Sequence, residues 1–438
     1  MTAWVRHGIW WQVYPLGFLG AEPRCPADGA GAAHRLEGLE PWLDYLVELG
    51  CNGLALGPVF ASETHGYDTV DHFRIDPRLG TDADFDKLVG RCRERGVRLL
   101  LDGVFNHVGR GFPAFRDVLA HGRDSRFADW FRLDFSADGP DGFGYADFEG
   151  HRHLVALNHE EPAVAEHVVA VMRHWLDRGA DGWRLDAAYA VPLPFWRTVS
   201  DRVRAAHPDV WLVGEVIHGD YPAWTDQGGL DATTQYELWK AVWSSLNDRN
   251  FFELAWALER HAAFSARFVP LTFVGNHDVT RLASVLDEPR HLELAVVVLC
   301  TVPGVPSVYY GDEQGFHGIK EDREGGDDAV RPAFPADPGG LAPYGWGVHR
   351  HHKRLLGLRR RHPWLVDARI EVVHLANEQI AYRATALDGS DSLIVLLNTA
   401  GEPRRMPVPE GTVVLAADGH GGDPAEAPGH GWTVIRPH

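Results

Sequence analysis

The sequence lacks the features of a secreted, disulfide-bonded or membrane-bound protein. No apolar run reaches the ~18–20 residues of a membrane helix, and the N-terminus runs into a strand-like segment without a signal-peptide pattern. The four cysteines form no Cys-x-x-Cys pair, which indicates free thiols and excludes a disulfide framework or a cysteine-based metal site. They are Cys25, Cys51, Cys92 and Cys300. We therefore expect a cytoplasmic protein.

Positive charge is also scarce, since the formal net charge is −19. This balance argues against nucleic acid or an anionic membrane as a partner, whereas a neutral substrate would be indifferent to it. The 438 residues are 45% hydrophobic, enough for one large domain and a smaller one. Sixteen tryptophans suit either aromatic core packing or a sugar-binding cleft.

Strand-like and helix-like segments alternate along most of the chain, which predicts a closed parallel (β/α)8 TIM barrel. The alternative is an open doubly wound sheet, but no Gly-x-Gly-x-x-Gly turn follows the first strand. The predicted strands are 9–14, 53–57, 97–102, 180–188, 210–215, 232–236, 271–275 and 305–310.

Two stretches depart from this alternation. Residues 108–157 are rich in Gly, Asp, Phe and Arg, so regular structure is hard to assign there, and we interpret them as an insertion after the third strand. From residue 366, short strands alternate with Gly, Asp and Pro turns, which predicts a C-terminal antiparallel β-sandwich at 366–438. The barrel would then consist of 1–107 and 158–365.

The predicted strand at 180–188 carries two charged residues within an apolar run, Arg184 and Asp186. Residues two apart on a strand point to the same face. A charged pair on an inward face is costly unless the charges are matched, hydrogen-bonded or used. This stretch alone leaves a structural ion pair and a functional pair equally open.

In a parallel barrel, functional side chains gather where the strands meet the following loops. Three acids from three different strands would converge there, together with histidines and an arginine, and a structural role explains such a set poorly. The side chains expected at this mouth are Tyr67, Asp68, Asp102, Asn106, His107, Arg184, Asp186, Glu215, His277 and Asp278.

Paired carboxylates without a metal motif or a Ser/His pair indicate glycosyl transfer. One acid attacks the anomeric carbon and must stay ionised, which Arg184 would favour for Asp186. The other acid must hold a proton for the leaving oxygen. Glu215 follows the apolar residues 210–214, so we expect a less polar environment around it.

These segments resemble the short sequence regions of the α-amylase family, glycoside hydrolase family 13. The segments similar to its four regions are 102–107, 182–187, 214–216 and 273–278, while 304–313 is similar to its last strand and 157–158 to the end of its extra domain.

The resemblance implies a retaining mechanism. It assigns Asp186 as the nucleophile, Glu215 as the general acid/base and Asp278 as the carboxylate that stabilises the oxocarbenium-like sugar. Residues 108–157 would be the family's domain B, and 366–438 its C-terminal domain.

The resemblance also implies a set of substrate-binding side chains. His107 and His277 would hydrogen-bond hydroxyls of the sugar at the cleavage site, and Tyr67 would stack beneath its ring. Arg184 would position the nucleophile, and Asp102 would brace Arg184.

Residues 62–71 and 214–218 look most like neopullulanases and cyclomaltodextrinases, which typically carry an extra N-terminal β domain that helps form a dimer. This chain starts at the barrel, so both a monomer and a homodimer are open. Thr64 stands where strict exo-α-glucosidases carry an aspartate, which argues against a strictly exo-acting enzyme. Tyr189 and Ala190 replace the Lys-His pair of endo-acting α-amylases, which argues for short substrates.

Two further side chains are expected in the cleft, Arg331 in the loop 325–332 and His218 three residues after Glu215. Each could instead be an exposed loop residue. Calcium is common in the family, with an asparagine like Asn106 as a ligand, but 108–157 holds no dense acidic calcium loop. No metal or cofactor is predicted.

We therefore expect a hydrolase of α-glucosidic bonds, α-1,4 above all, in short malto-oligosaccharides or related α-glucosides. A glucanotransferase or sugar isomerase is the alternative, because a sugar hydroxyl could replace water at the same intermediate. A non-catalytic sugar-binding barrel is a third hypothesis, which the three intact carboxylates disfavour.

Overall fold

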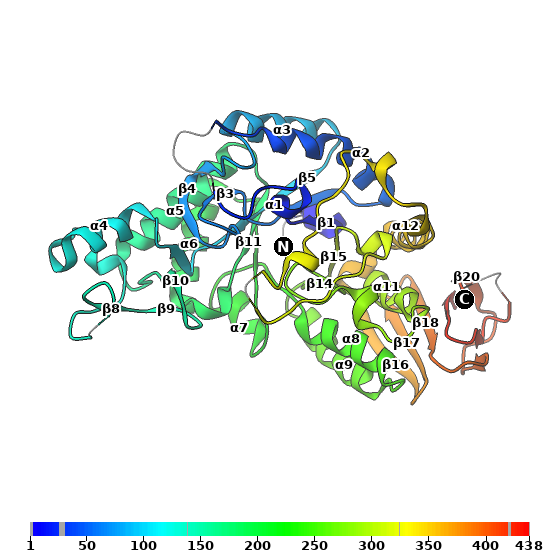
Figure 1. Cartoon of the computed structure of the whole chain (residues 1–438). Helices are drawn as coiled ribbons and strands as arrows, with labels where there is room; N and C mark the ends of the chain where they lie inside the picture. The colour runs from blue at the N-terminus through cyan, green and yellow to red at the C-terminus, as the bar shows by residue number, and fades with distance from the viewer. Residues whose placement is uncertain (1–2, 26–30, 138, 324, 419–421, 438) are drawn as a thin grey trace.

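Eight parallel strands form the centre of the computed structural model, which describes residues 3–25, 31–137, 139–323, 325–418 and 422–437 (Figure 1). Strand β1 pairs with both β2 and β15, and a parallel bridge between Thr234 and Leu271 joins the two ends of the sheet. The sheet therefore closes into the predicted barrel. Its strands are β1 (Trp10–Val13), β2 (Gly53–Leu56), β5 (Arg98–Gly103), β11 (Gly182–Leu185), β12 (Trp211–Gly214), β13 (Ala232–Thr233), β14 (Leu271–Phe273) and β15 (Val305–Tyr309).

Helices surround the barrel. Thr81 and Asp84 form a capping box at the start of α3, and α2 ends at Gly50, whose φ of 110° is left-handed. No helix in the described ranges is both long and apolar enough to cross a membrane. The main helices are α2 (Glu40–Leu49), α3 (Asp82–Glu94), α5 (Pro162–Asp177), α6 (Leu193–Ala206), α8 (Tyr236–Asn247), α9 (Phe252–Ser265), α11 (His291–Thr301) and α12 (Trp346–Arg361).

Tryptophan packing fills the lower part of the barrel. Trp10 and Trp211, at the first positions of β1 and β12, stack inside it with ring centroids 5.5 Å apart and planes 3° apart. Trp11 faces the opposite way and stacks on Trp42 of α2. Because strand side chains alternate, Gln12 points inward again, above Trp10. The apolar floor thus supports a polar layer nearer the C-terminal ends of the strands.

The two largest differences from the predicted strand bounds lie at β11 and β13. The segment 180–188 is a strand only at Gly182–Leu185, because Ala187 adopts a left-handed conformation with φ 44° and a 3-10 turn follows at Ala188–Ala190. The segment 232–236 is a strand only at Ala232–Thr233, and helix α8 begins at Tyr236. Asp186 therefore lies just beyond β11, where the chain turns towards the mouth of the barrel.

The insertion 108–157 forms a lobe at one side of the barrel (Figure 1). A three-stranded antiparallel sheet, in the order β6-β10-β9, leads into it, and β7 and β8 form a second hairpin. Phe115, Phe131 and Tyr145 pack edge to face within it. Its elements are β6 (His107–Gly109), α4 (Pro113–His121), β7 (Leu133–Asp134), β8 (Gly144–Tyr145), β9 (Asp147–Phe148) and β10 (His151–Ala156).

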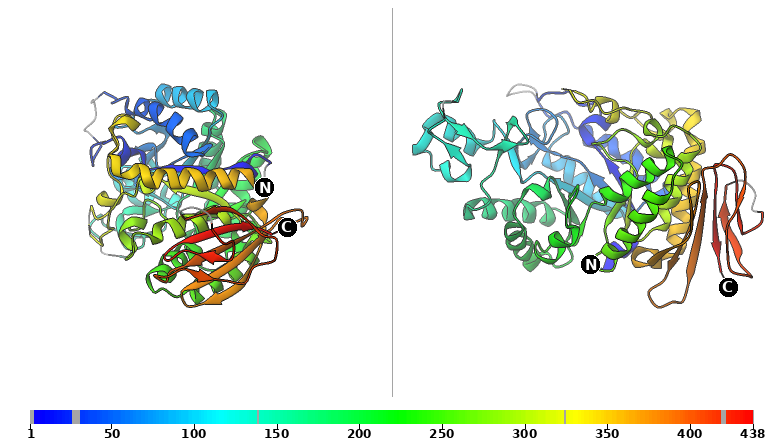
Figure 2. Two further views of the ribbon diagram at one scale, coloured as in Figure 1. Left: turned by 90° about the vertical axis from the view of Figure 1, so that its right-hand side faces the viewer. Right: turned by 90° about the horizontal axis from the view of Figure 1, so that it is seen from below.

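The C-terminal region is an antiparallel sheet at the end of the molecule opposite the insertion (Figure 2). Its five strands follow the order β16-β17-β18-β22-β20, and the short pair β19–β21 adds a second layer over a core that includes Met406 and Ala427. The predicted sandwich is thus confirmed. Its strands are β16 (Arg369–Ala376), β17 (Gln379–Thr385), β18 (Ser392–Asn398), β19 (Arg404–Arg405), β20 (Val413–Ala417), β21 (Glu426–Ala427) and β22 (Trp432–Arg436).

Candidate active site

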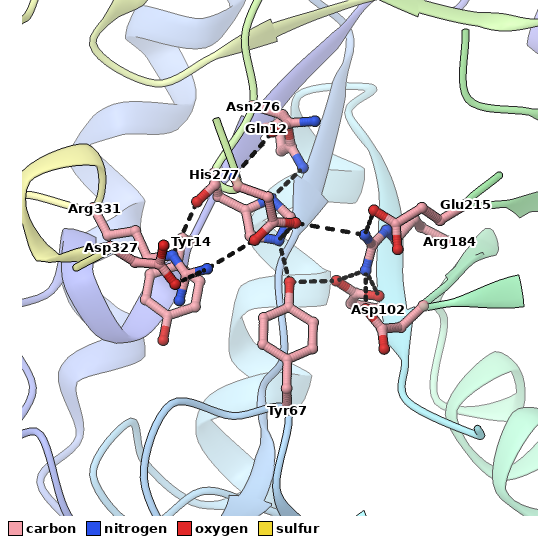
Figure 3. Close-up of polar contacts among 12 residues, drawn as sticks. Gln12, Tyr14, Tyr67, Asp102, Arg184, Glu215, Asn276, His277, Asp327 and Arg331 are labelled. Atoms are coloured by element: carbon pink, nitrogen blue, oxygen red, sulfur yellow. Dashed lines mark hydrogen bonds and ion pairs between the residues drawn. The ribbon is translucent and has the colours of Figure 1, made fainter. Parts of the chain in front are cut away.

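One guanidinium joins the acids at the C-terminal mouth of the barrel. Arg184 Nη1 donates to both oxygens of Asp102 at 2.9 Å and to Asp186 Oδ1 at 2.8 Å. Its Nη2 lies 2.6 Å from Glu215 Oε1 and 4.0 Å from Asp278 Oδ2. Figure 3 shows Arg184 between Asp102 and Glu215. The adjacent, in-register strands β5, β11 and β12 explain this convergence.

Burial raises the pKa of two of these carboxylates, Asp102 and Asp186. Burial raises the pKa of Asp186 well above its ordinary value; Arg184 lowers it, and Glu215 and Asp102 raise it again. Burial likewise raises the pKa of Asp102 to about 6 against the opposing effect of Arg184. Burial therefore favours a proton on Asp102 or Asp186 near neutral pH, and the charge of each affects the pKa of the other.

The surroundings of Glu215 are polar, so the expectation of a less polar environment is wrong. Besides Arg184, the backbone N–H of Ala187 donates to Glu215 Oε2 at 3.0 Å, and the Tyr236 hydroxyl donates to Oε1 at 3.1 Å. Asn276 Nδ2 donates to that hydroxyl at 2.9 Å, which directs its proton towards Glu215. These partners come from other elements, so the apolar residues before Glu215 in sequence gave no sign of them.

Asp278 is held as an anion. Arg331 Nη2 approaches its Oδ1 at 2.8 Å, and His277 Nε2 approaches its Oδ2 at 3.0 Å. Burial raises the pKa of Asp278, but His277, Arg331 and Arg184 together outweigh burial and keep it below its usual range. Because burial lowers the pKa of His277 to about 3, the two arginines are the cations that balance Asp278 at neutral pH.

Two neutral histidines present N–H donors in the site. Asn106 Nδ2 lies 3.1 Å from His107 Nδ1. Gln12 Nε2 lies 3.2 Å from His277 Nδ1, a contact drawn in Figure 3. An amide nitrogen only donates, so each Nδ1 accepts and each Nε2 carries the hydrogen. Burial lowers the pKa of His107 to about 3. Its Nε2 is buried without a hydrogen-bond partner, which suits a donor awaiting a ligand oxygen.

Aromatic rings line the same wall. Tyr67 stacks on His277 with centroids 5.7 Å apart and planes 6° apart, and its hydroxyl donates to Asp102 Oδ2 at 3.3 Å. Tyr14 also lies parallel to His277, with centroids 6.1 Å apart. Arg331 lies over the Tyr14 ring at 4.6 Å. Their flat faces suit the apolar face of a sugar ring.

The structure places Arg331 in contact with an acid of the site and leaves His218 exposed. Arg331 belongs to the site, because its side chain is 9% exposed, pairs with Asp278 and Asp327, and donates to the His277 carbonyl at 3.0 Å. His218 is exposed, with its ring centroid 6.4 Å from that of Tyr189.

Several side chains in the site were absent from the sequence prediction: Gln12, Tyr14, Tyr236, Asn276 and Asp327. Gln12 had a detectable signal, since it is the only polar side chain in the apolar strand Trp10–Val13. The others act across elements and left no comparable local signal.

The insertion reaches the site through the turn between β9 and β10. Phe148 stacks on His107 with centroids 4.7 Å apart and planes 18° apart. The Tyr189 hydroxyl donates to Glu149 Oε1 at 2.9 Å. This hydrogen bond connects the insertion to the loop after β11 and so bounds the site next to Asp186.

Comparisons with known proteins agree with this geometry. The family model described as alpha amylase, catalytic domain, matches residues 12–339. A cyclomaltodextrinase of Geobacillus thermopakistaniensis is 32% identical over 432 residues, covering 93% of this chain and 71% of the relative. Neopullulanase 2 of Thermoactinomyces vulgaris is 31% identical over 432 residues, with 93% and 72% covered.

A solved relative extends the likeness over the whole chain. The cyclic α-maltosyl-(1→6)-maltose hydrolase of Arthrobacter globiformis, in complex with that sugar, superposes with a TM-score of 0.83 at 26% identity, covering 100% of this chain and 99% of the other. With the family model spanning most of the chain, the predicted family is confirmed. The protein belongs to the α-amylase family of glycoside hydrolases.

Proposed function

We propose that the protein hydrolyses α-1,4-glucosidic bonds of short malto-oligosaccharides with retention of configuration, through a covalent glycosyl-enzyme. The observation that carries this proposal is the guanidinium of Arg184, which contacts Asp186 at 2.8 Å and Glu215 at 2.6 Å. A nucleophile and an acid/base must lie close together on either side of the scissile bond in a retaining site.

In the first step, a carboxylate oxygen of Asp186 would attack the anomeric carbon. The bond to the leaving oxygen breaks as Glu215 gives that oxygen its proton, leaving the sugar esterified to Asp186 and Glu215 ionised. In the second step, Glu215 takes a proton from water while the water oxygen attacks the same carbon, which frees Asp186. Two successive displacements retain the configuration.

The neighbouring groups have defined roles in this scheme. The ionised Asp278 would stabilise the positive charge that develops on the sugar ring. The unpartnered Nε2–H of His107 would donate to a sugar hydroxyl, and that of His277 would do so where the sugar displaces its contact with Asp278. Tyr67 would lie against the face of the sugar. The Ala187 N–H and the Tyr236 hydroxyl would hold the Glu215 carboxyl in place for its proton transfers.

The boundary formed by Tyr189 and Glu149 supports a preference for short chains. Solved relatives carry cyclic α-maltosyl-(1→6)-maltose or maltose, which agrees with small α-glucans as the substrate class. A glucanotransferase or isomerase would use the same first step and replace water by a sugar hydroxyl.

Product analysis tests the proposal. The protein is incubated in parallel with maltotriose, cyclodextrin, pullulan, isomaltose, trehalose and sucrose, and products are separated by chromatography. Glucose and maltose alone support hydrolysis, whereas products longer than the substrate favour the transferase. Early proton NMR spectra should show the α-anomer first. Initial release of the β-anomer, or no turnover of any α-glucoside, would contradict the proposal.

A further inference from the structure

A second polar pocket lies at the end of the barrel opposite the active site. Ile9 and Asn52, which immediately precede β1 and β2, form part of its wall, so it opens at the N-terminal ends of the strands. Its volume is about 250 Å³. This is several times the roughly 30 Å³ that one water molecule occupies in the liquid. The pocket can therefore hold a polyatomic ligand.

A buried cation lines this pocket. Arg359 of α12 is only 5% exposed, and its guanidinium donates to the backbone carbonyls of Cys300, Val302 and Gly304. These bonds use Nη1 and Nη2, while Nε has no hydrogen bond to any described residue. No carboxylate in the described parts of the chain pairs with Arg359. A buried cation without a counter-charge is unfavourable unless another group supplies one.

Two more guanidinium groups line the same pocket. Arg360 is exposed and donates to the Gly50 carbonyl at 3.1 Å. Arg6 is 43% exposed and pairs with Asp367 at 2.6 Å. Three arginines thus line one pocket, and Arg6 alone of them pairs with a described carboxylate, in a protein whose net charge is −19. The pocket is therefore a local positive site on an acidic molecule.

The side chain of Asn52 holds the pocket wall in place. Asn52 Oδ1 accepts from the Ile9 N–H at 2.8 Å, and Asn52 Nδ2 donates to the His7 carbonyl at 2.9 Å. The segment before β1, which carries Arg6, is therefore fixed against the start of β2. A preformed wall lowers the ordering cost of binding.

We propose that this pocket binds a small oxyanion, with inorganic phosphate as the representative ligand. Guanidinium groups match the paired oxygens of phosphate or carboxylate and bind them through charge-assisted hydrogen bonds. A bound anion would join α12 to the segment before β1 and supply the counter-charge that Arg359 lacks. Its site is separate from the sugar cleft, so it would stabilise the protein without competing with the substrate.

Phosphate titrations of the whole chain test this site. Thermal unfolding is followed at constant ionic strength while phosphate replaces chloride, and isothermal calorimetry measures the dissociation constant directly. We expect a saturable rise in Tm with phosphate and one binding site per chain. Parallel titrations with acetate and citrate show whether the site prefers phosphate or carboxylate ligands. Equal Tm values in all these salts, or calorimetry without saturation, would overturn the proposal.

Variants assign the binding to this pocket. Arg6→Gln with Arg360→Gln should weaken phosphate binding by at least about tenfold, because each removes a charged donor. Arg360→Gln alone should give a smaller loss. Arg361→Gln is the matched control, since Arg361 is exposed on the same helical turn but does not line the pocket. All three should turn over malto-oligosaccharides at the unsubstituted rate. Unchanged phosphate affinity in the double variant would refute the assignment.

Discussion

Arg184 and Glu215 come from neighbouring strands of the barrel, and Arg184 Nη2 lies 2.6 Å from Glu215 Oε1. The same guanidinium contacts Asp186 at 2.8 Å. The proposed nucleophile and acid/base are therefore positioned by one side chain, and a proton on either acid changes the field at the other. Substitutions around Arg184 should therefore change the catalytic rate and its pH dependence separately.

Replacing either acid with its amide should stop catalysis without unfolding the protein. Asp186→Asn removes the nucleophile and Glu215→Gln removes the proton donor, so we expect kcat on maltotriose to fall by at least about 10³-fold. Asp388→Asn, in an exposed turn, is the matched control. Glu215→Gln should keep a larger fraction of its activity on α-glucosyl fluoride than on maltotriose, because the fluoride leaving group needs no proton. An active Asp186→Asn protein, shown free of deamidation by mass spectrometry, would refute the assignment.

Removing the charge of Asp102 should move the acid limb of activity to lower pH. Ionised Asp102 is among the groups that raise the pKa of Asp186, so Asp102→Asn should lower that pKa and keep the nucleophile ionised in more acidic solution. We expect a displacement of about one pH unit in kcat/KM. Asp102→Glu keeps the charge and serves as the control. A limb that stays in place in Asp102→Asn, or moves to higher pH, would contradict this coupling.

Gln12 should act by fixing the hydrogen of His277 on Nε2. Gln12→Met removes the amide donor, and we expect kcat/KM to fall about tenfold because His277 can then adopt either tautomer. Gln12→Glu should lose more, since its carboxylate accepts from Nδ1–H and favours the opposite tautomer. The pH profile should change only in the Glu variant. Equal activity of the Glu variant and the unsubstituted protein would exclude this role.

The fold and the acids of the site were predictable because both depend on local sequence signals. The alternation of apolar strands with helices indicated the barrel, and its geometry placed Asp186, Glu215 and Asp278 at one end. The partners of Glu215 were not predictable in this way. Tyr236 begins a helix after β13, and Ala187 contributes a backbone N–H through its left-handed turn.

Arg331 is another residue whose contacts could not be predicted from the sequence. Its loop sequence allowed an exposed arginine, and only the fold shows that it lies over Tyr14 and pairs with Asp278. Sequence patterns report which residues share a strand or a helix, whereas contacts between distant loops depend on the closed barrel. The chemistry was therefore easier to predict than the walls of the cleft, on which substrate choice depends.

Opening the bridge between Tyr189 and Glu149 should relax the preference for short chains. Tyr189→Phe and Glu149→Gln each weaken the 2.9 Å hydrogen bond, and we expect kcat/KM on maltoheptaose to rise about threefold relative to maltotriose. The double variant should resemble each single variant, because all three weaken one bond. Glu410→Gln, exposed in the C-terminal region, is the control. An unchanged ratio would show that this bridge does not limit chain length.

Glu313 should make stability depend on pH. It is fully buried, with Tyr45 donating from its hydroxyl at 2.9 Å, the Gly311 N–H at 2.9 Å and Trp11 Nε1 at 3.5 Å, and no described cation pairs with it. Burial raises its pKa from 4.5 to about 7. Between these values the unfolded chain releases the proton and the folded protein keeps it, so the stability that the protonated group contributes below pH 4.5 is lost as the pH rises towards 7.

A rise of this size corresponds to about 3 kcal/mol for a fully buried group. Glu313→Gln keeps the shape and loses the titration, so its Tm should fall less between pH 5 and pH 8 than that of the unsubstituted protein. Glu410→Gln is again the control, because an exposed carboxyl should leave the slope unchanged. Calorimetric scans across this pH range measure both slopes. Parallel curves for Glu313→Gln and the unsubstituted chain would show that Glu313 is not the group that titrates.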